Sequence, residues 1–398
     1  MDECLIPDIY RSDHLFLLMG KNPLPNYVVA RLLLKTDGVL YLVHSEGPQG
    51  TGGVAQRLAA HFPKHQPQLI PVNPLDVVAL RCEVERYLKR TSCGSIGLNY
   101  TGGTKVMAVH SYRAVEQFCK EQRREVVFSY LDADTLELTI EPQRGQTAFR
   151  CKSVQAVELS IPELFDLHGI RLQGQPQTEP LMPDLARALA QMHGTPAGIE
   201  AWQDSRKVLQ ACDGRLWQEV KAELLDVGTT PDVVEHMESA LGLRESEPVN
   251  LRVTARQAGL KSSRELLLWL DGTWLENWGL ACIKALGCPH RARSLTGLTP
   301  SRFEIDVAVM RGYQLFALSC SVTTDRTKAK GKLLEVFTRA RQIGGDEARM
   351  GLVCAVDDPQ GLEHEIAREW DAGNRVRVFG RQHLLDLQTY LKAWFETV

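Results

Sequence analysis

The sequence predicts an α/β protein that begins with a Rossmann-like parallel sheet. In the first 150 residues, short apolar runs alternate with segments whose apolar residues recur at helical spacing, which is typical of a doubly wound sheet. The chain has 398 residues, too many for one ordinary core. We therefore expect an N-terminal Rossmann-like domain, a helical connector and a C-terminal α/β domain.

The N-terminal strands are expected where apolar runs are bounded by turn residues. Five runs alternate with helical patterns, and two further strands follow them. The expected strands are 14–19, 39–43, 69–72, 96–100, 126–131, 136–140 and 149–159.

The rest of the chain divides by pattern. Residues 183–245 are mostly helical in pattern, and 265–286 form a strong helix candidate carrying Trp274 and Trp278. Strands are expected at 303–309, 313–320, 351–356 and 376–379, separated or followed by helices. The expected domains are 1–155, 156–250 and 251–398.

Composition limits the classes of function. The formal net charge of −3 gives no global basic field, so any nucleic acid must bind at local patches. No apolar run approaches the roughly 20 residues that span a membrane. The N-terminus lacks a signal-peptide layout and no cysteines form a CxxC pair, so we expect a cytoplasmic protein with reduced thiols.

The most informative segment is 99–107, Asn-Tyr-Thr-Gly-Gly-Thr-Lys-Val-Met, between an expected strand and an expected helix. A Thr-Gly-Gly-Thr-Lys turn gathers backbone N–H groups, two hydroxyls and one ammonium at a helix N-terminus. This chemistry suits an anionic, phosphate-bearing ligand. The segment is neither the GxGxxG fingerprint nor a P-loop.

Two more strand ends carry unusual residues. Gly20, Asn22 and Pro23 follow the first strand, and Ser45 follows the second. All three turns should open at one edge of the sheet, where ligands of such folds bind. The alternative is that they are ordinary tight turns, because Gly and Asn are common there.

A second constellation lies near the C-terminus. Asp306 is expected on one strand, Ser319-Cys320-Ser321 on the next, and Glu276 on the preceding helix. Two carboxylates and a nearby donor can hold Mg²⁺ or Mn²⁺ through oxygen ligands. Taken alone, Asp306 also fits an ordinary solvated or salt-bridged acid.

The turn at 101–105, with the Pro-Leu-Pro-Asn segment at 23–26, resembles the CARF domain of CRISPR-associated ancillary proteins. The resemblance covers residues 1–150 and implies a sensor for cyclic oligoadenylate made by type III CRISPR complexes. Cyclic tetra-adenylate is the expected ring, bound on the two-fold axis of a homodimer. The implied pocket is lined by Gly20, Asn22, Pro23, Ser45, Thr101, Gly102, Gly103, Thr104 and Lys105.

Within this pocket the resemblance implies that Lys105 places charge near phosphate, with the Gly102 and Gly103 N–H groups in direct contact. Some CARF domains also cleave their own activator, and Thr101, Thr104 and Lys105 could then orient a ribose hydroxyl. A nucleotide-dependent enzyme acting at this N-terminal site is a third reading.

Residues 251–398 resemble the PD-(D/E)xK restriction-endonuclease-like fold attached to CARF domains. The resemblance implies that Glu276 and Asp306 are metal-side acids. This chain departs from acid-x-Lys, because Ser319 and Ser321 stand at the acid and lysine positions. The main-chain carbonyl of Cys320 could still ligate metal, and a lysine could arrive from Lys328, Lys330 or Lys332. We assign Lys330 to the expected catalytic set, with Glu276, Asp306, Ser319 and Ser321.

The leading expectation is a ring-activated, metal-dependent nuclease that cuts DNA or RNA. The alternative is a sensor whose nuclease-like domain binds nucleic acid or a protein partner without cutting. The missing lysine at Ser321 favours the alternative, because the loss of one charged group costs several kcal/mol of transition-state stabilisation.

Overall fold

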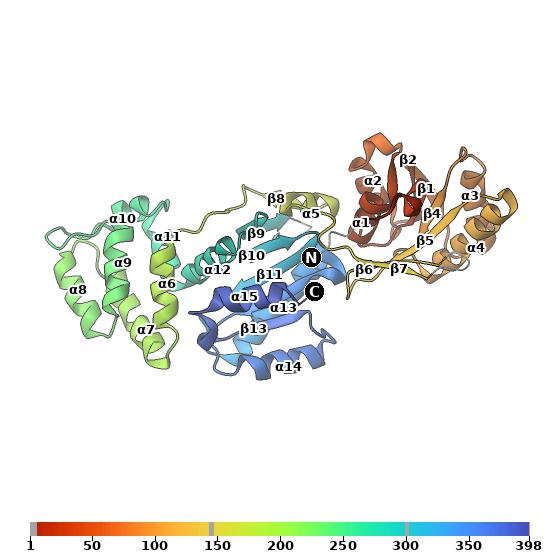
Figure 1. Ribbon diagram of the computed structural model, residues 1–398. Helices are drawn as coiled ribbons and strands as arrows, with labels where there is room; N and C mark the ends of the chain where they lie inside the picture. Colours follow the sequence, from red (N-terminus) through yellow and green to blue (C-terminus); the bar gives the residue numbers. More distant parts are fainter. Residues whose placement is uncertain (1–5, 143–146, 299–301, 398) are drawn as a thin grey trace.

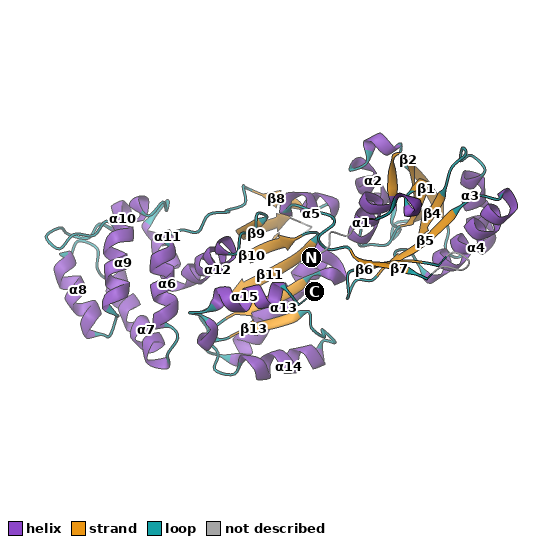
Figure 2. Ribbon diagram, viewed as in Figure 1, coloured by secondary structure: helices purple, strands orange, loops and turns teal. Residues whose placement is uncertain are grey.

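The computed structural model describes residues 6–142, 147–298 and 302–397. Three regions lie in a row (Figure 1): a sheet with its helices formed by the start of the chain, a second sheet in the centre, and a group of helices at the opposite end. Figure 2 shows the same view with helices, strands and loops in different colours. The described ends of the chain both lie near the central sheet.

The first sheet confirms the expected Rossmann-like fold. Its strand order is β3-β2-β1-β4-β5-β6-β7, and the first five strands in this order are parallel. Antiparallel β6 and β7 extend one edge. The strands are β1 (Ser12–Leu18), β2 (Leu34–Ser45), β3 (Gln68–Val72), β4 (Ile96–Asn99), β5 (Val126–Leu131), β6 (Glu137–Ile140) and β7 (Phe149–Lys152).

Helices cover both faces of this sheet because successive strand residues point to opposite faces. Leu15 and Leu17 of β1 pack in one hydrophobic core, whereas Phe16 and Leu18 pack in another. The first core includes residues of α1 and α2, and the second includes residues of α3 and α4. These helices are α1 (Leu24–Leu33), α2 (Gly52–Ala60), α3 (Val77–Leu88) and α4 (Lys105–Gln122).

The second sheet has the order β13-β12-β11-β10-β9-β8. Strands β8 to β11 pair antiparallel, whereas β11, β12 and β13 pair parallel. The first hydrophobic core continues into this sheet, so the two sheets share buried contacts. The elements are β8 (Arg171–Gln173), β9 (Arg291–Leu298), β10 (Arg302–Arg311), β11 (Gln314–Cys320), β12 (Arg349–Val353), β13 (Val376–Phe379), α13 (Arg326–Gly344), α14 (Pro359–Glu369) and α15 (Leu387–Phe395).

The remaining helices fill the segment between β8 and β9. Several begin at a capping side chain: Thr195, Thr230 and Asn250 each accept a hydrogen bond from a backbone N–H of the first turn. The helices are α6 (Pro183–Met192), α7 (Pro196–Gln210), α8 (Trp217–Asp226), α9 (Pro231–Leu241), α10 (Leu251–Gln257) and α11 (Ser263–Leu268), and α5 (Ile161–Leu167) precedes β8.

The structure differs from the expected elements in three places. The helix expected over 265–286 is divided into α11, a π-helical segment η3 (Trp269–Thr273) and α12 (Trp274–Ala285), because Gly272 leaves the helical conformation. The strand expected over 149–159 ends at Lys152. Strands β8 and β9 were not expected, and their pairing brings the chain into the second sheet before the group of helices begins.

Two further findings concern the environment of the protein. Across the described residues, no helix combines the length and apolar character that crossing a bilayer requires. Cys151 is disulfide-bonded, which departs from the expectation of reduced thiols, whereas the other described cysteines are free.

Candidate functional sites

The three predicted turns meet at the carboxyl edge of the first sheet. Strands β2, β1 and β4 are parallel neighbours, so the turns that follow them lie side by side. The Thr51 hydroxyl donates a hydrogen bond to the Met19 carbonyl oxygen at 3.1 Å, which joins the turn after β2 to the turn after β1. Ser45 secures the same loop, because its hydroxyl accepts from the Thr51 N–H at 3.1 Å.

The turn after β4 approaches the turn after β1 so closely that only glycine fits. A Cβ at Gly102 would lie 2.2 Å from the Leu18 carbonyl oxygen, and one at Gly20 would lie 3.5 Å from the Gly103 nitrogen. Gly103 also has φ of +77°, in the left-handed region that favours glycine. The glycines therefore serve backbone packing at this edge, and direct ligand contact by their N–H groups stays a prediction.

The polar side chains of the turn have different roles. The Thr101 hydroxyl accepts from the Leu131 N–H at 2.7 Å, and the Thr104 hydroxyl caps α4 by accepting from the Met107 N–H at 3.2 Å. Lys105 is the first residue of α4 and is exposed, and no ion pair of its side chain is recorded within the described residues. Its ammonium is thus free to meet an anion beside the helix N-terminus.

Asn22 and Pro23 make contacts within the protein, and their expected contact with the ring stays a prediction. Pro23 is the N-cap residue of α1. The Asn22 amide nitrogen donates to the Glu347 carboxylate at 2.9 Å, and its oxygen accepts from the Leu24 N–H at 3.0 Å. The Asn22 side chain therefore contacts the second sheet domain, which sequence reasoning missed.

The C-terminal acids do come together. Glu276 on α12 is partly exposed, and its carboxylate accepts from the Ser294 hydroxyl at 2.9 Å. Burial, followed by the charge of Asp306, raises the pKa of Glu276 to about 8. The buried Arg293 guanidinium and the Ser294 hydrogen bond act in the opposite direction.

Asp306 is held from the neighbouring strand. Its Oδ2 accepts from the Ser319 hydroxyl at 2.9 Å and from the Cys320 N–H at 2.7 Å. Burial nevertheless raises the pKa of Asp306. Ser321 has a backbone role, because its N–H donates to the Val353 carbonyl oxygen at 2.9 Å.

The structure does not support the expected role of Lys330. Its ammonium lies 2.7 Å from a carboxylate oxygen of Glu365 and 2.7 Å from one of Glu369, both on α14. Two carboxylates on the outer side of the sheet therefore hold it. Lys332, on the same helix, is the lysine whose charge lowers the pKa of Asp306.

The acids fit a divalent cation in their chemistry. Mg²⁺ in proteins commonly binds one or two carboxylates and completes its shell with water and substrate phosphates. Glu276 and Asp306 offer such a pair, and a bound cation would oppose the burial that raises both pKa values and the charge of Asp306 that raises the pKa of Glu276. No group of three or more His, Cys, Asp or Glu side chains in the described parts of the chain is arranged to hold a metal.

Sequence reasoning also missed Ser294 and Arg293 beside Glu276. Both lie on β9, a strand with no clear alternation in its sequence, Arg-Ala-Arg-Ser-Leu-Thr-Gly-Leu. Ser294 has φ of +51°, and no pattern in the sequence predicts this backbone conformation. The antiparallel pairing of β9 with β10 was the signal needed to place them near Asp306.

Solved structures resemble the chain over nearly its whole length. Protein VC1899 from Vibrio cholerae matches with a TM-score of 0.62 and 14% identity, over 96% of this chain and 98% of that one. Can2 from Sulfobacillus thermosulfidooxidans, in complex with cyclic tetra-adenylate, matches with a TM-score of 0.65 and 14% identity, over 98% and 99%. No family model and no curated protein matches the sequence. At this identity the likeness shows a shared fold.

The raised pKa of Glu276 predicts how a substitution changes stability with pH. The folded pKa of about 8 exceeds the ordinary value of 4.5, so the wild-type chain loses stability as pH rises between these values. We expect Glu276→Gln, with chelator present, to raise the free energy of unfolding on the order of 2–4 kcal/mol at pH 9 and to change little at pH 4. Denaturant titration at both pH values measures this, with Glu200→Gln on α7 as the exposed control. Equal stability of wild type and Glu276→Gln at pH 9 would contradict it.

Proposed function

We propose that the chain senses cyclic oligoadenylate, in the first instance cyclic tetra-adenylate, at the carboxyl edge of its first sheet, as part of CRISPR antiviral defence. The observation that carries the proposal is the junction of three turns at this edge, with backbone packed at Gly102 and a free cation at Lys105. Can2, which shares the fold, was solved with cyclic tetra-adenylate bound. The ring's phosphates match an ammonium at a helix N-terminus.

A homodimer suits a symmetric ring, because identical half-sites can read it from two sides. Exposed apolar side chains lie just before α3, in its first turn and in α4. Leu75 is 93% exposed, Val78 73% and Val109 54%. Helices α3 and α4 pack against each other, and we propose that these exposed side chains form one surface. We assign this surface to the dimer contact.

The output that we propose is a metal-dependent nuclease centre for DNA or RNA at Glu276 and Asp306. A bound Mg²⁺ or Mn²⁺ would activate water and polarise the phosphate. Ser319 and the Cys320 N–H orient Asp306, and Ser294 orients Glu276. The two acids would hold the cation, and the main-chain carbonyl of Cys320 is the third ligand that we propose.

A second candidate has a specific observation in its favour. Ser321 stands where the nuclease pattern has lysine, and Lys330 is bound by Glu365 and Glu369. With no lysine ammonium in contact with Asp306 among the described residues, the second domain would bind nucleic acid or a protein partner without cutting. Sensing at the first sheet is common to both candidates.

Removal of the free cation tests the sensing site. We expect Lys105→Ala to weaken binding of cyclic tetra-adenylate about tenfold to hundredfold, because a charge-assisted hydrogen bond is lost. Lys120→Ala, in the last turn of the same helix, is the matched control and should leave affinity unchanged. Calorimetry measures both. Equal affinity of Lys105→Ala and wild type would remove Lys105 from the site.

A charge on the proposed dimer surface tests the assembly. We expect Val109→Glu to shift the protein from dimer to monomer in light scattering, because a charge would be desolvated in the contact. Leu225→Glu on α8 changes a residue of similar exposure, 40%, outside this surface and should leave the dimer intact. A dimer that persists in Val109→Glu would place the contact elsewhere.

A cleavage assay separates the two candidates. Wild-type protein is mixed with Mn²⁺ and plasmid or single-stranded RNA, with and without cyclic tetra-adenylate. The nuclease proposal expects ring-dependent cleavage that falls about hundredfold or more in Asp306→Asn. Absence of cleavage in every mixture contradicts it. In that case, activity gained by Ser319→Glu with Ser321→Lys would establish the second candidate.

A further inference from the structure

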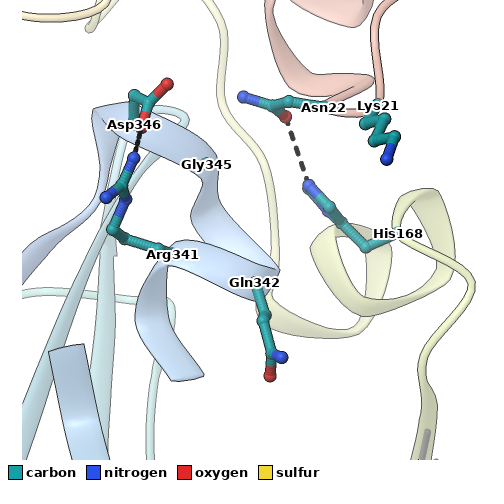
Figure 3. A pocket seen from close by; sticks show the side chains of 7 residues that line it. All are labelled: Lys21, Asn22, His168, Arg341, Gln342, Gly345 and Asp346. Atoms are coloured by element: carbon teal, nitrogen blue, oxygen red, sulfur yellow. Dashed lines mark hydrogen bonds and ion pairs between the residues drawn. The ribbon is translucent and has the colours of Figure 1, made fainter. Parts of the chain in front are cut away.

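The Asn22 side chain joins the turn after β1 to two elements of the second domain. Its amide nitrogen donates to Glu347 Oε2 at 2.9 Å, and its oxygen lies 3.3 Å from His168 Nε2. Figure 3 shows the Asn22 and His168 side chains directed toward each other from different segments. The oxygen also accepts from the Leu24 N–H at 3.0 Å, so the same amide fixes the start of α1.

The contact is tight as well as polar. Gly345 begins the short helix η4 (Gly345–Glu347) and has φ of +66°. A Cβ at Gly345 would lie 1.9 Å from the Asn22 amide nitrogen. Glycine is therefore required at this position both for its backbone conformation and for the space that the Asn22 amide occupies.

On the far side of the contact lies α13, the helix that brings charged side chains toward Asp306. Helix α13 ends at Gly344, where η4 begins, and it packs against β11 and β12. Lys332 and Glu335 of α13 bring charge to Asp306. A shift of η4 would therefore change the position of α13, the helix that adjoins Asp306.

Beside the contact is a cavity of about 370 Å³, which the turn after β1 helps to line. Lys21 and Asn22 line it from the first domain, and Arg341, Gln342 and Asp346 line it from the second (Figure 3). Arg341 is paired with Asp346, so its charge is already compensated within the cavity wall.

We infer that Asn22 is a positioning residue that couples the ring-sensing turn to η4 and α13, and that its amide acts through Glu347 and Gly345 instead of contacting the ring. This inference rests on the proposed sensing function. It is an alternative to the ring contact expected for Asn22, since the amide oxygen and one amide N–H are engaged within the protein. Sites that are coupled in this way change each other's affinity reciprocally.

The test uses Gly345→Ala in the full chain, because its new methyl group displaces the Asn22 amide from the second domain. We expect faster hydrogen–deuterium exchange in peptides covering 20–27, which include the Leu24 amide. We also expect cyclic tetra-adenylate to bind about fivefold more weakly or worse. Gly287→Ala is the control: its φ is +73°, and its Cβ would meet no atom within 4 Å.

Asn22→Ala is the second variant and does not depend on Gly345→Ala folding well. It should speed exchange in peptides covering 345–353. Adding Gly345→Ala should cause less further change in Asn22→Ala than in the wild type, because the displaced amide is already absent and only the backbone strain and the contact with the Glu347 carboxylate remain. Unchanged exchange in both single variants, or an equal effect of Gly287→Ala, would overturn the coupling.

The ring measurement separates this inference from the proposed function. If wild-type protein does not bind cyclic tetra-adenylate, the sensing proposal fails, and the exchange measurements alone decide whether Asn22 couples the domains. If wild type binds the ring, unchanged or tighter binding by Gly345→Ala would overturn the inference. If Asn22→Ala loses binding of cyclic tetra-adenylate without any change of exchange at 345–353, Asn22 contacts the ring directly and the inference is overturned.

Discussion

The close approach of Gly102 to the Leu18 carbonyl oxygen is the constraint on which the N-terminal edge depends. A Cβ at 2.2 Å is impossible there, so the two turns can meet only because position 102 has no side chain. The buried Asn26 amide also donates a hydrogen bond to the Leu18 carbonyl oxygen, at 3.0 Å, and so fixes its position. With Thr101 and Thr104 also engaged by backbone N–H groups, the edge is a preorganised platform. Lys105 is left to respond to a ligand, and a rigid platform lowers the ordering cost of binding one.

In the second domain, basic side chains of α13 are paired with acids of α14, whereas two other acids are enclosed without such a partner among the described residues. On the outer face, Lys330 and Arg326 surround Glu365 and lower its pKa to about 2. In the centre, Glu276 and Asp306 have raised pKa values and are stabilised by hydroxyl and N–H donors. Lys330 is thus paired away from the acids, whereas Lys332 brings positive charge toward Asp306. Buried carboxyls with raised pKa values mark functional candidates more often than ordinary surface acids do.

Local pattern was enough for the parallel sheet and for most helices, because their apolar periods follow from burial on one or both faces. It failed where long-range contacts decide. Strand β8 has three residues and becomes a strand only by pairing with β9. The hydrogen bond of Asn22 to Glu347 was not expected, because the two residues lie 325 positions apart in the chain. The break at Gly272 was missed because the apolar stripe continues through it from Leu270 to Trp274.

The free-energy balance at Glu276 and Asp306 bears on whether these acids bind a cation. A carboxylate pair enclosed without a cation is destabilising, and similar groups replaced by apolar residues often stabilise a protein. Here each acid keeps dedicated donors: Ser294 for Glu276, and Ser319 with the Cys320 N–H for Asp306. Such donors favour the ionised form against the burial that opposes it. An arrangement in which two carboxyls with raised pKa values keep hydrogen-bond donors to their ionised forms suits a cation that arrives from solution and favours ionisation. A serine at position 321 therefore weakens the proposal of cutting more than it weakens the proposal of metal binding.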